Sequence, residues 1–373
     1  MNKSSRVIIS VIVIVLVVWG VSVANKKGDA GRTKIGVITA LTGSAGVATY
    51  GEPLKKGLDL ALREVDPEGK RYELVFEDYM LDTKQALPAY TKLKSEGVKV
   101  FIVDGSPALS VLAPEIRKDG YLAMNPTSFI PSYKDGNPLT CRMALTADSY
   151  GPAYADLLIN KLKIKKAVAL IPNFEAGVAL IDAVRSAYEK AGGQILGTEM
   201  YAKDATDFKT NIEKLKAFKD ADAIFVVNYF NSATPMFKQM QILGLNKKVI
   251  SDDWTLTIID KALVEGAYYV GYDFSLTSPA SEKGKKYFTD HSLAYGSTPL
   301  MNSVVGYDMM SILDEAFRNA STTDAQGLSY YMINSMGAYD GVGGRIAFNS
   351  DCEVERDIIF GTIKNGKAEL IGK

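Results

Sequence analysis

The chain has 373 residues, of which 47% are hydrophobic and 23% are charged, as is typical of a soluble globular protein. A single hydrophobic core stops growing below this length, so we expect two lobes. Lysine plus arginine and aspartate plus glutamate both number 43. This balance predicts no nucleic acid partner and no broad anionic surface as a partner.

Residues 1–24 form a distinct segment with the layout of an export signal. Lys3 and Arg6 precede an apolar run, residues 7–23, that ends in small residues suited to cleavage. As a helix this run would be ~25 Å long, close to the thickness of a bilayer core. We therefore expect a periplasmic or exported protein in which the segment is a signal peptide or a retained N-terminal membrane anchor. Membrane contact, and any tether to the inner membrane, is expected only through residues 7–24.

The chain after this segment alternates between strand and helix patterns. Residues 35–41 form an apolar run typical of a buried strand, and a small-residue loop follows at residues 42–46. Apolar residues then recur at helical spacing over residues 54–65. The same alternation predicts strands at residues 72–77, 100–103 and 121–124, with helices from about Asp82 and over Ser106–Lys118.

A second set of elements repeats the alternation. It predicts helices at residues 148–162, 177–191, 208–218 and 234–243, and strands at residues 167–171, 195–201, 223–227 and 248–250. Each unit is close to the ~30 residues of a βαβ element, which predicts parallel sheets with right-handed crossovers. The fold class is therefore α/β with two sheets, the first of which ends near residue 140.

The pattern loosens after Tyr272. Two further helices are expected, at Glu282–Tyr295 and at residues 302–318, followed by a strand at residues 345–348 and another at residues 357–363. Late helices with a terminal hairpin predict that the chain returns to the first lobe and builds no third domain.

Two cysteines, Cys141 and Cys352, are too few for a disulfide scaffold. In an oxidising compartment they could pair and close a loop of roughly 210 residues, with a substantial entropic effect. They could equally be two buried free thiols, since cysteine packs well in a core. The sequence leaves both alternatives open, because it does not show whether their Cα atoms approach each other.

The sequence lacks the motifs that mark several common enzyme classes. The chain has one histidine, His291, which we expect to be solvated on a surface helix. The nucleophile-elbow, zinc-protease and paired-cysteine motifs do not occur. Residues 361–368 mimic a phosphate-binding loop, but they end in alanine and precede no helix, so we reject that interpretation. We therefore expect no enzyme activity, no cofactor and no metal site.

Polar or aromatic residues follow successive strands of the first predicted sheet, at the edge where ligands of such folds bind. Ser106 begins a helix, so its hydroxyl and the backbone N–H groups are suited to a carboxylate. A purely structural role is the alternative, because a serine that caps a helix and is followed by proline at the first helical position gives the same sequence. Thr127, Ser128 and Phe129 follow the next strand and offer two hydroxyls and a ring, although an ordinary polar turn has the same composition.

The second predicted sheet shows the same arrangement. Asp252 and Asp253 end a strand, where they would either cap a following helix or pair with a ligand ammonium. Phe174 and Tyr229 also follow strands and could form a wall, although a single aromatic residue is more often part of the core. Together the two sets predict a cleft that traps a small ligand.

Taken in order, these segments resemble the type I periplasmic binding proteins, in particular the leucine/isoleucine/valine-binding group that serves ABC importers. The resemblance covers residues 34–370, and it lies in an ordered set of short matches, none of which is diagnostic alone. The matches are residues 34–38, 41–43, 50–51, 103–116, 125–128, 142, 151–152, 306–308 and 339–348.

The resemblance implies two Rossmann-like lobes with parallel sheets, joined by a three-strand hinge and closing over a small molecule. It places the three crossovers near residues 144–147, 270–272 and 357–359. The first lobe would consist of residues 34–143 and 272–356, and the second of residues 144–271 and 357–373.

The resemblance also implies a ligand-binding set drawn from both lobes. Ser106, Thr127 and Ser128 would hold a ligand carboxylate through hydroxyl and backbone groups. Asp253 falls where the family has an acidic residue for the ammonium of an amino acid. The aromatic walls would be Tyr50, Phe174 and Tyr229.

The chain departs from the pattern of the branched-chain binders at two positions. Phe129 stands where those proteins carry a small hydroxyl residue, which removes a polar contact and leaves room for an aromatic or non-amino-acid ligand. Asp104 adds a charge beside Ser106. The side-chain specificity of the site therefore stays open.

These inferences lead to the hypothesis of an exported, non-enzymatic solute-binding protein. It would capture a small molecule, foremost a branched-chain or related amino acid, and deliver it to the membrane subunits of an ABC importer. Closure would follow from the ligand's higher affinity for the closed state. Two alternatives remain, a ligand-sensing receptor domain of the same fold and a binder of a small aromatic acid.

Overall fold

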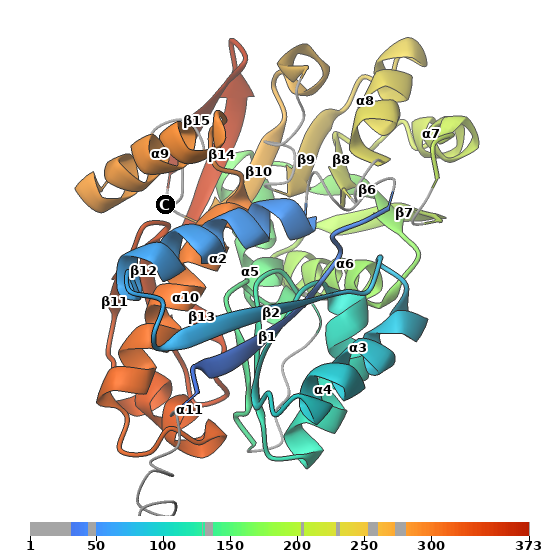
Figure 1. The fold of residues 1–373 in the computed structure, drawn as a ribbon. Helices are drawn as coiled ribbons and strands as arrows, with labels where there is room; N and C mark the ends of the chain where they lie inside the picture. Colours follow the sequence, from blue (N-terminus) through green and yellow to red (C-terminus); the bar gives the residue numbers. More distant parts are fainter. Residues whose placement is uncertain are drawn as a thin grey trace, which may run out of the picture.

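Two large β-sheets with helices on their faces form the framework of the molecule (Figure 1). The structure is a computed structural model that describes residues 31–43, 50–128, 130, 137–202, 205–228, 232–252, 260–272 and 281–372. The predicted signal or anchor, residues 1–24, lies outside these ranges. Within them, no helix combines the length and the apolar character that a membrane span requires. We call the part built on the sheet nearer the N-terminus the first lobe, and the part built on the other large sheet the second lobe.

The first lobe contains a five-stranded parallel sheet with the strand order β2-β1-β3-β4-β5. Its strands and connecting helices are β1 (Thr33–Thr39), α2 (Glu52–Val65), β2 (Tyr72–Asp78), α3 (Thr83–Ser95), β3 (Val100–Val103), α4 (Ser106–Lys118), β4 (Leu122–Asn125) and β5 (Thr140–Arg142). The predicted alternation of strands and helices is confirmed. Strand β5 was not predicted, because three residues are too few to show a periodic pattern.

The second lobe contains a seven-stranded sheet with the order β15-β14-β10-β9-β8-β6-β7. Strands β6 to β9 run parallel, as predicted, and β10, which was not predicted, pairs parallel with β9. Strands β14 and β15 add an antiparallel hairpin at one edge. Its elements are α5 (Ala147–Asp156), continued by a π-helical turn (Leu157–Lys161), β6 (Lys166–Pro172), α6 (Glu175–Lys190), β7 (Gln194–Tyr201), α7 (Lys209–Lys216), β8 (Ala223–Val226), α8 (Ala233–Ile242), β9 (Lys248–Asp252), a 3₁₀ turn (Lys261–Val264), β10 (Tyr268–Tyr272), β14 (Ile358–Lys364) and β15 (Lys367–Gly372).

Three helices and a small antiparallel sheet lie between β10 and β14. They are α9 (Glu282–Tyr295), α10 (Met301–Asn319), α11 (Ala325–Asn334), β11 (Tyr339–Gly341), β12 (Gly344–Phe348) and β13 (Val354–Glu355). Helix α10 packs against α2, and α11 packs against β4. Helix α11 was not predicted. Its start is nevertheless marked by Asp324, which caps the helix by accepting the N–H of Gly327 at 2.8 Å.

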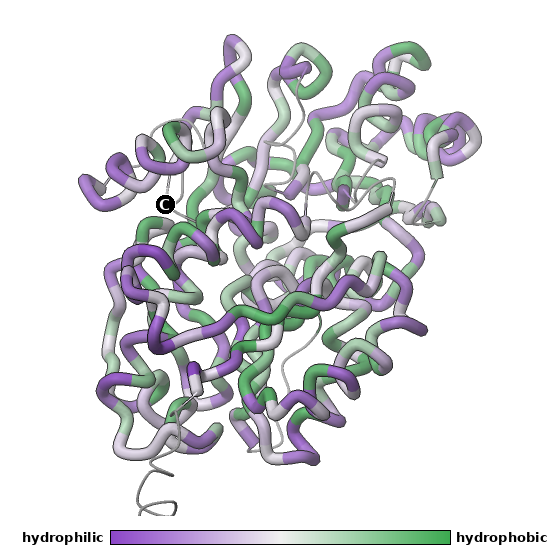
Figure 2. The backbone as a smooth tube through the Cα atoms, viewed as in Figure 1, coloured by the Kyte–Doolittle hydropathy of each residue, from purple (hydrophilic) through white to green (hydrophobic). Residues whose placement is uncertain are grey.

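Apolar residues gather along the central strands, and the outer faces of the peripheral helices are more hydrophilic (Figure 2). In the first lobe α2 and α10 pack closely against each other. A Cβ added at Gly57 would lie only 1.9 Å from the carbonyl oxygen of Ser303. The absence of a side chain at this position is therefore what allows the two helices to meet.

His291 is buried, so the prediction of a solvated histidine was wrong. Its side chain lies among aromatic rings, with centroid distances of 5.9 Å to Tyr287 and 4.9 Å to Tyr295. The ring Nδ1 lies 2.9 Å from the carbonyl oxygen of Ser297. Burial lowers the pKa of the imidazole below its ordinary value. Both rings lie on α9 itself, one turn before and one turn after His291. Tyr287 also contacts Ser303 of α10, and Tyr295 donates to the carbonyl of Lys56 of α2, so this face of α9 is covered by other helices.

Three passages of chain connect the lobes, from β5 to α5, from β10 to α9 and from β13 to β14. Cys141 and Cys352 form a disulfide with their Cα atoms 4.6 Å apart, which resolves the alternative that the sequence left open. The disulfide joins β5 to the residues just before β13. It therefore ties the first passage to the third.

Candidate functional site

Ser106 is the first residue of α4 and follows β3 after the two loop residues Asp104 and Gly105. Gly105, and not Ser106, occupies the N-cap position, so the alternative of a serine N-cap is wrong. Glycine is required there because its φ is +83° and a Cβ would lie 2.7 Å from Tyr79 Oη. Gly105 supplies no capping side chain to the helix. The Ser106 hydroxyl and the first amide groups of α4 are therefore suited to a carboxylate.

Asp104 is a fully buried carboxylate that links the ends of three neighbouring strands. Thr39, the last residue of β1, donates its hydroxyl to Asp104 Oδ2 at 2.8 Å. Thr127, which follows β4, donates its hydroxyl to Oδ1 at 3.0 Å. Burial raises the pKa of Asp104 to about 6, although hydrogen bonds from Thr39, Thr127 and Gly105 act in the opposite direction. Among the described residues, no lysine or arginine pairs with this carboxylate.

Asn125 shapes the turn that carries Thr127 and Ser128. Its Oδ1 accepts the backbone N–H of Thr127 at 2.9 Å and that of Ser128 at 2.6 Å, and its Nδ2 donates to the carbonyl of Val103 at 2.5 Å. Both backbone amides of the predicted pair are therefore already engaged. Ser128 Oγ accepts the N–H of Ile130 at 3.4 Å, which leaves the serine proton for another acceptor.

Tyr50 lies at the start of α2 and is largely buried. Its side chain belongs to a hydrophobic cluster shared with Leu54 of α2 and Val305 of α10. Its carbonyl oxygen accepts a hydrogen bond from Asn302 Nδ2 at 3.3 Å. Residues of α2 and α10 thus surround much of Tyr50. The role of Tyr50 as a wall of the ligand site stays a prediction.

Phe174 follows β6 after one residue, at the N-cap of α6, and reaches the first lobe. It packs against a hydrophobic cluster whose other members are mostly first-lobe residues. Ala176, only 2% exposed, belongs to the same cluster. Between these two residues, Glu175 Oε2 accepts a hydrogen bond from Ser110 Oγ of α4 at 2.7 Å. The two lobes therefore touch where α6 begins.

The ends of β8 and β9 are joined by a buried polar network. Asp252 Oδ2 accepts the backbone N–H of Asn228 at 2.9 Å, and its Oδ1 accepts Asn228 Nδ2 at 3.1 Å. Asn228 Nδ2 also donates to Ser251 Oγ at 2.6 Å. Asp252 thus holds the end of β8 in place. Whether it also caps a following helix depends on residues 253–259, which lie outside the described ranges.

The structure places some of the predicted ligand residues close together, and others lie outside the described residues. Ser106 and Thr127 are neighbours, because the N–H of Gly105 donates to Thr127 Oγ1 at 3.3 Å. Phe129, Tyr229 and Asp253 lie outside the described residues. Two scaffold roles escaped the sequence analysis, that of Asn125 within the turn and that of Asp104 across three strands. The signal for Asn125 was an asparagine followed by proline, a common turn-forming pair.

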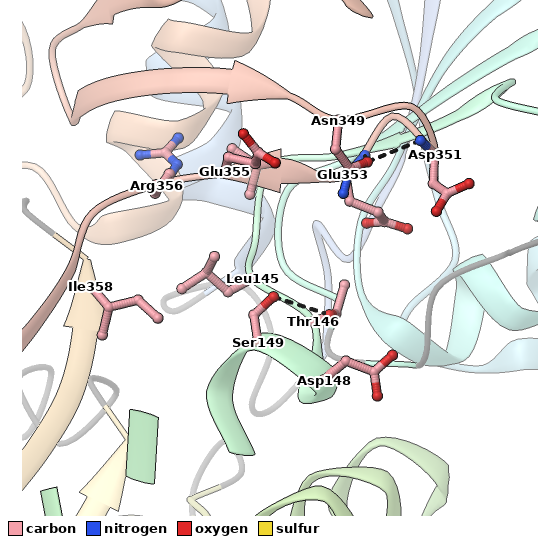
Figure 3. Close-up of a pocket in the computed structure, with 11 residues that line it drawn as sticks. Leu145, Thr146, Asp148, Ser149, Asn349, Asp351, Glu353, Glu355, Arg356 and Ile358 are labelled. Carbon is pink, nitrogen blue, oxygen red and sulfur yellow. Dashed lines mark hydrogen bonds between the residues drawn. The ribbon is translucent and has the colours of Figure 1, made fainter. Parts of the chain in front are cut away.

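A pocket of about 360 Å³ lies at the hinge, away from the predicted ligand residues (Figure 3). It lies between the first and third passages, where Asn349 Oδ1 accepts the N–H groups of Asp351 and Glu353 at 3.0 Å each. Carboxylates outnumber cations in its lining, which does not suit an anionic ligand. The lining residues are Leu145, Thr146, Asp148, Ser149, Asn349, Asp351, Glu353, Val354, Glu355, Arg356 and Ile358.

Two α/β lobes joined by three passages, with polar groups after the strands of each, define a bilobed solute-binding fold. The sequence matches the periplasmic binding protein family over residues 32–368, and the chain belongs to this family. The resemblance to the type I members of the leucine/isoleucine/valine-binding group is confirmed. The chain is accordingly a solute-binding protein and not an enzyme.

Individual relatives and solved structures are similar over most of the chain. An amino acid binding protein of Pseudomonas aeruginosa is 25% identical over 299 residues, which are 78% of this chain and 79% of that protein. A leucine binding protein from Thermotoga maritima has a TM-score of 0.81 at 21% identity, covering 91% of this chain and 97% of that one. An ABC transporter solute binding protein from R. palustris, in complex with benzoate, has a TM-score of 0.80 at 18% identity, with coverages of 92% and 96%. These structural similarities show the shared fold.

Proposed function

We propose that this protein is exported, captures a small carboxylate between its lobes and delivers it to the membrane subunits of an ABC importer. The ligand we favour is an amino acid, branched-chain or related, in keeping with the names of the relatives from P. aeruginosa and T. maritima. The observation that carries the proposal is Ser106 at the start of α4, where glycine supplies no capping side chain to the helix. That arrangement favours a bound carboxylate.

Recognition would use groups from both lobes. Ser106 and the first amides of α4 would hold the ligand carboxylate, together with the hydroxyl of Ser128. Thr127 would act through its position, because its own proton is donated to Asp104. Asp253 would accept the ligand ammonium through a charge-assisted hydrogen bond. The walls would be Tyr50, Phe174 and Tyr229.

Closure would couple binding to delivery. A ligand that contacts both lobes stabilises the closed arrangement by its higher affinity for that state. For the moving units we propose residues 34–143 with 272–356 and residues 144–271 with 357–373. The disulfide between Cys141 and Cys352 lies within the first of these units, so it does not oppose their relative rotation.

A small aromatic acid is the second candidate ligand. The R. palustris protein is described in complex with benzoate, and Phe129 of this chain would add an aromatic ring next to Ser128. Benzoate shares the carboxylate with an amino acid but lacks the ammonium. Asp253→Asn therefore separates the two candidates, since it removes a partner that only the amino acid uses.

The N-terminal segment bears on the partner of the protein. We propose residues 1–24 as a cleaved export signal or a retained anchor, with residues 7–24 as the tether in the second case. Retention would favour a ligand-sensing receptor of the same fold over an importer component. N-terminal sequencing of the mature protein from its native membrane and soluble fractions distinguishes the two.

A thermal-shift screen of the purified protein against the standard amino acids and a set of benzoates tests the function, because a ligand that binds the native state raises its melting temperature. At least one of these solutes should bind, and Ser106→Ala should weaken its binding by about tenfold or more in calorimetry. Ser95→Ala, an exposed serine on α3, is the matched control and should leave affinity unchanged. Absence of binding by every solute in the screen would refute the proposal.

A further inference from the structure

The contact between α4 and α6 joins the two lobes through side chains that lie beside the predicted ligand site. Ser110 Oγ donates to Glu175 Oε2 at 2.7 Å, and this is a hydrogen bond between residues 65 positions apart. Ala176 is almost fully buried in a cluster whose other buried members lie in the first lobe. In Figure 1, α6 of the second lobe lies above α3 and α4 of the first.

Each residue of this contact is fixed to an element that also carries a predicted ligand residue. Ser110 follows Ser106 by four residues on α4, so the two side chains lie on one face of the helix. Glu175 and Ala176 directly follow Phe174. The contact therefore forms and breaks with the same lobe movement that brings Ser106 and Phe174 together.

The contact favours the closed arrangement by two physical effects. Removing Ala176 from water adds a small hydrophobic contribution. The hydrogen bond to the Glu175 carboxylate adds a further contribution, modest because that side chain is exposed to solvent. Neither effect needs the ligand, and both are lost when the lobes separate.

We propose that Ser110, Glu175 and Ala176 form an interlobe latch that slows ligand release without touching the ligand. The latch rests on the proposed function, since it acts on a ligand held between the lobes. Ser110 and Glu175 are thus positioning residues. They set affinity through the balance of open and closed states.

Stopped-flow and calorimetric measurements with L-leucine and with benzoate as probes test the latch. Ser110→Ala and Glu175→Ala should each weaken binding by about three- to tenfold, mainly through faster dissociation. The double variant should have the same affinity for the probe as the single variant with the lower affinity, because the two changes remove the same hydrogen bond. Glu189→Ala, an exposed glutamate later on α6, is the matched control. Unchanged dissociation rates in both latch variants would overturn the proposal.

A wedge at Ala176 gives an independent measurement. In open lobes residue 176 would face solvent, so Ala176→Trp should leave the melting temperature of the ligand-free protein unchanged. The indole would hold the closed lobes apart, and affinity for the probe should fall by more than about tenfold. Wild-type affinity in this variant would contradict the latch.

A ligand-free cross-linking experiment separates the latch from the proposed function. The pair Ser110→Cys and Glu175→Cys should react with a short bifunctional maleimide to give more cross-linked product than the control pair Ser110→Cys and Glu189→Cys. If the cross-link forms but no probe binds wild type, the interlobe contact is supported and the proposed function, with the effect of the latch on ligand release, is refuted. If a probe binds but the yield only matches the control, the latch fails and the function stands.

Discussion

Arg142 and Glu353 form a buried, bidentate ion pair one residue away from the disulfide between Cys141 and Cys352. Arg142 Nε lies 2.6 Å from Glu353 Oε2, and Nη2 lies 2.5 Å from Oε1. The backbone N–H of Arg142 also donates to the carbonyl of Cys352 at 2.9 Å. Covalent, ionic and backbone links thus join the same two segments at adjacent positions. The first and third passages between the lobes therefore start from segments that are held firmly together.

Breaking the ion pair should destabilise the protein strongly. Glu353→Gln leaves the Arg142 guanidinium buried without a counter-charge, so the free energy of unfolding should fall by about 3–5 kcal/mol. Guanidinium-induced unfolding measures this loss. Replacing both residues by apolar ones of similar size, Arg142→Met with Glu353→Leu, should recover most of it. Glu115→Gln, which breaks an exposed pair with Lys118, is the control and should change stability by less than about 1 kcal/mol.

Removing the disulfide tests the covalent link separately. Cys141→Ser with Cys352→Ser frees a loop closed across 211 residues, which in the chain-entropy model destabilises the native state by about 5 kcal/mol. The ion pair remains in this variant, so the melting temperature should fall while the fold and the ligand-binding stoichiometry persist. Differential scanning calorimetry of oxidised wild type and of the double variant makes the comparison. Equal melting temperatures would show that the disulfide contributes nothing to stability.

Asp104 should make stability depend on pH in a defined direction. Burial raises its pKa from 3.8 to about 6, so the native state holds a proton that the unfolded chain releases. The contribution of Asp104 to the free energy of unfolding is therefore fully present below about pH 4, and it is lost as the pH rises through about 6. The expected loss is about 3 kcal/mol. Asp308, whose pKa burial also raises to about 6, acts in the same direction.

The variant Asp104→Asn removes this titration and leaves that of Asp308. Its free energy of unfolding should therefore fall less than that of wild type between pH 4.5 and pH 7. Asp324→Asn, at the exposed cap of α11, should retain the wild-type dependence. Chemical denaturation at a series of pH values gives the slopes. Parallel curves for wild type and Asp104→Asn would show that Asp104 is ionised at its ordinary pKa.

The sequence predicted best those features that local pattern determines. Helix α4 was predicted with the bounds that the structure shows, because Gly105 and Pro107 mark its start and Gly120 follows its end. Helix α11 was missed because its ten residues include Gly327 and carry no clear apolar stripe. The burial of His291 was missed because the face of α9 that carries it is covered by α2 and α10, which the local sequence does not show.

The same distinction applies to the candidate site. Ser106 and Thr127 were placed near each other because the carboxyl ends of neighbouring parallel strands meet at one edge of a sheet. The bridging role of Asp104 could not be predicted, because it requires the order β1-β3-β4 as well as the exact ends of those strands. The pairing of Cys141 with Cys352 required the path of the chain through both lobes.

The crossing of α2 and α10 should tolerate no side chain at Gly57. A Cβ there would lie 1.9 Å from the carbonyl oxygen of Ser303, and backbone cannot rotate away as a side chain could. Gly57→Ala should force the helices apart and lower the free energy of unfolding by about 1–3 kcal/mol, despite the better helix propensity of alanine. Gly31→Ala, where a Cβ meets nothing within 4 Å, is the matched control. Urea denaturation compares the free energies of unfolding of the two variants. Equal values would show that α2 and α10 can move apart at no cost in stability.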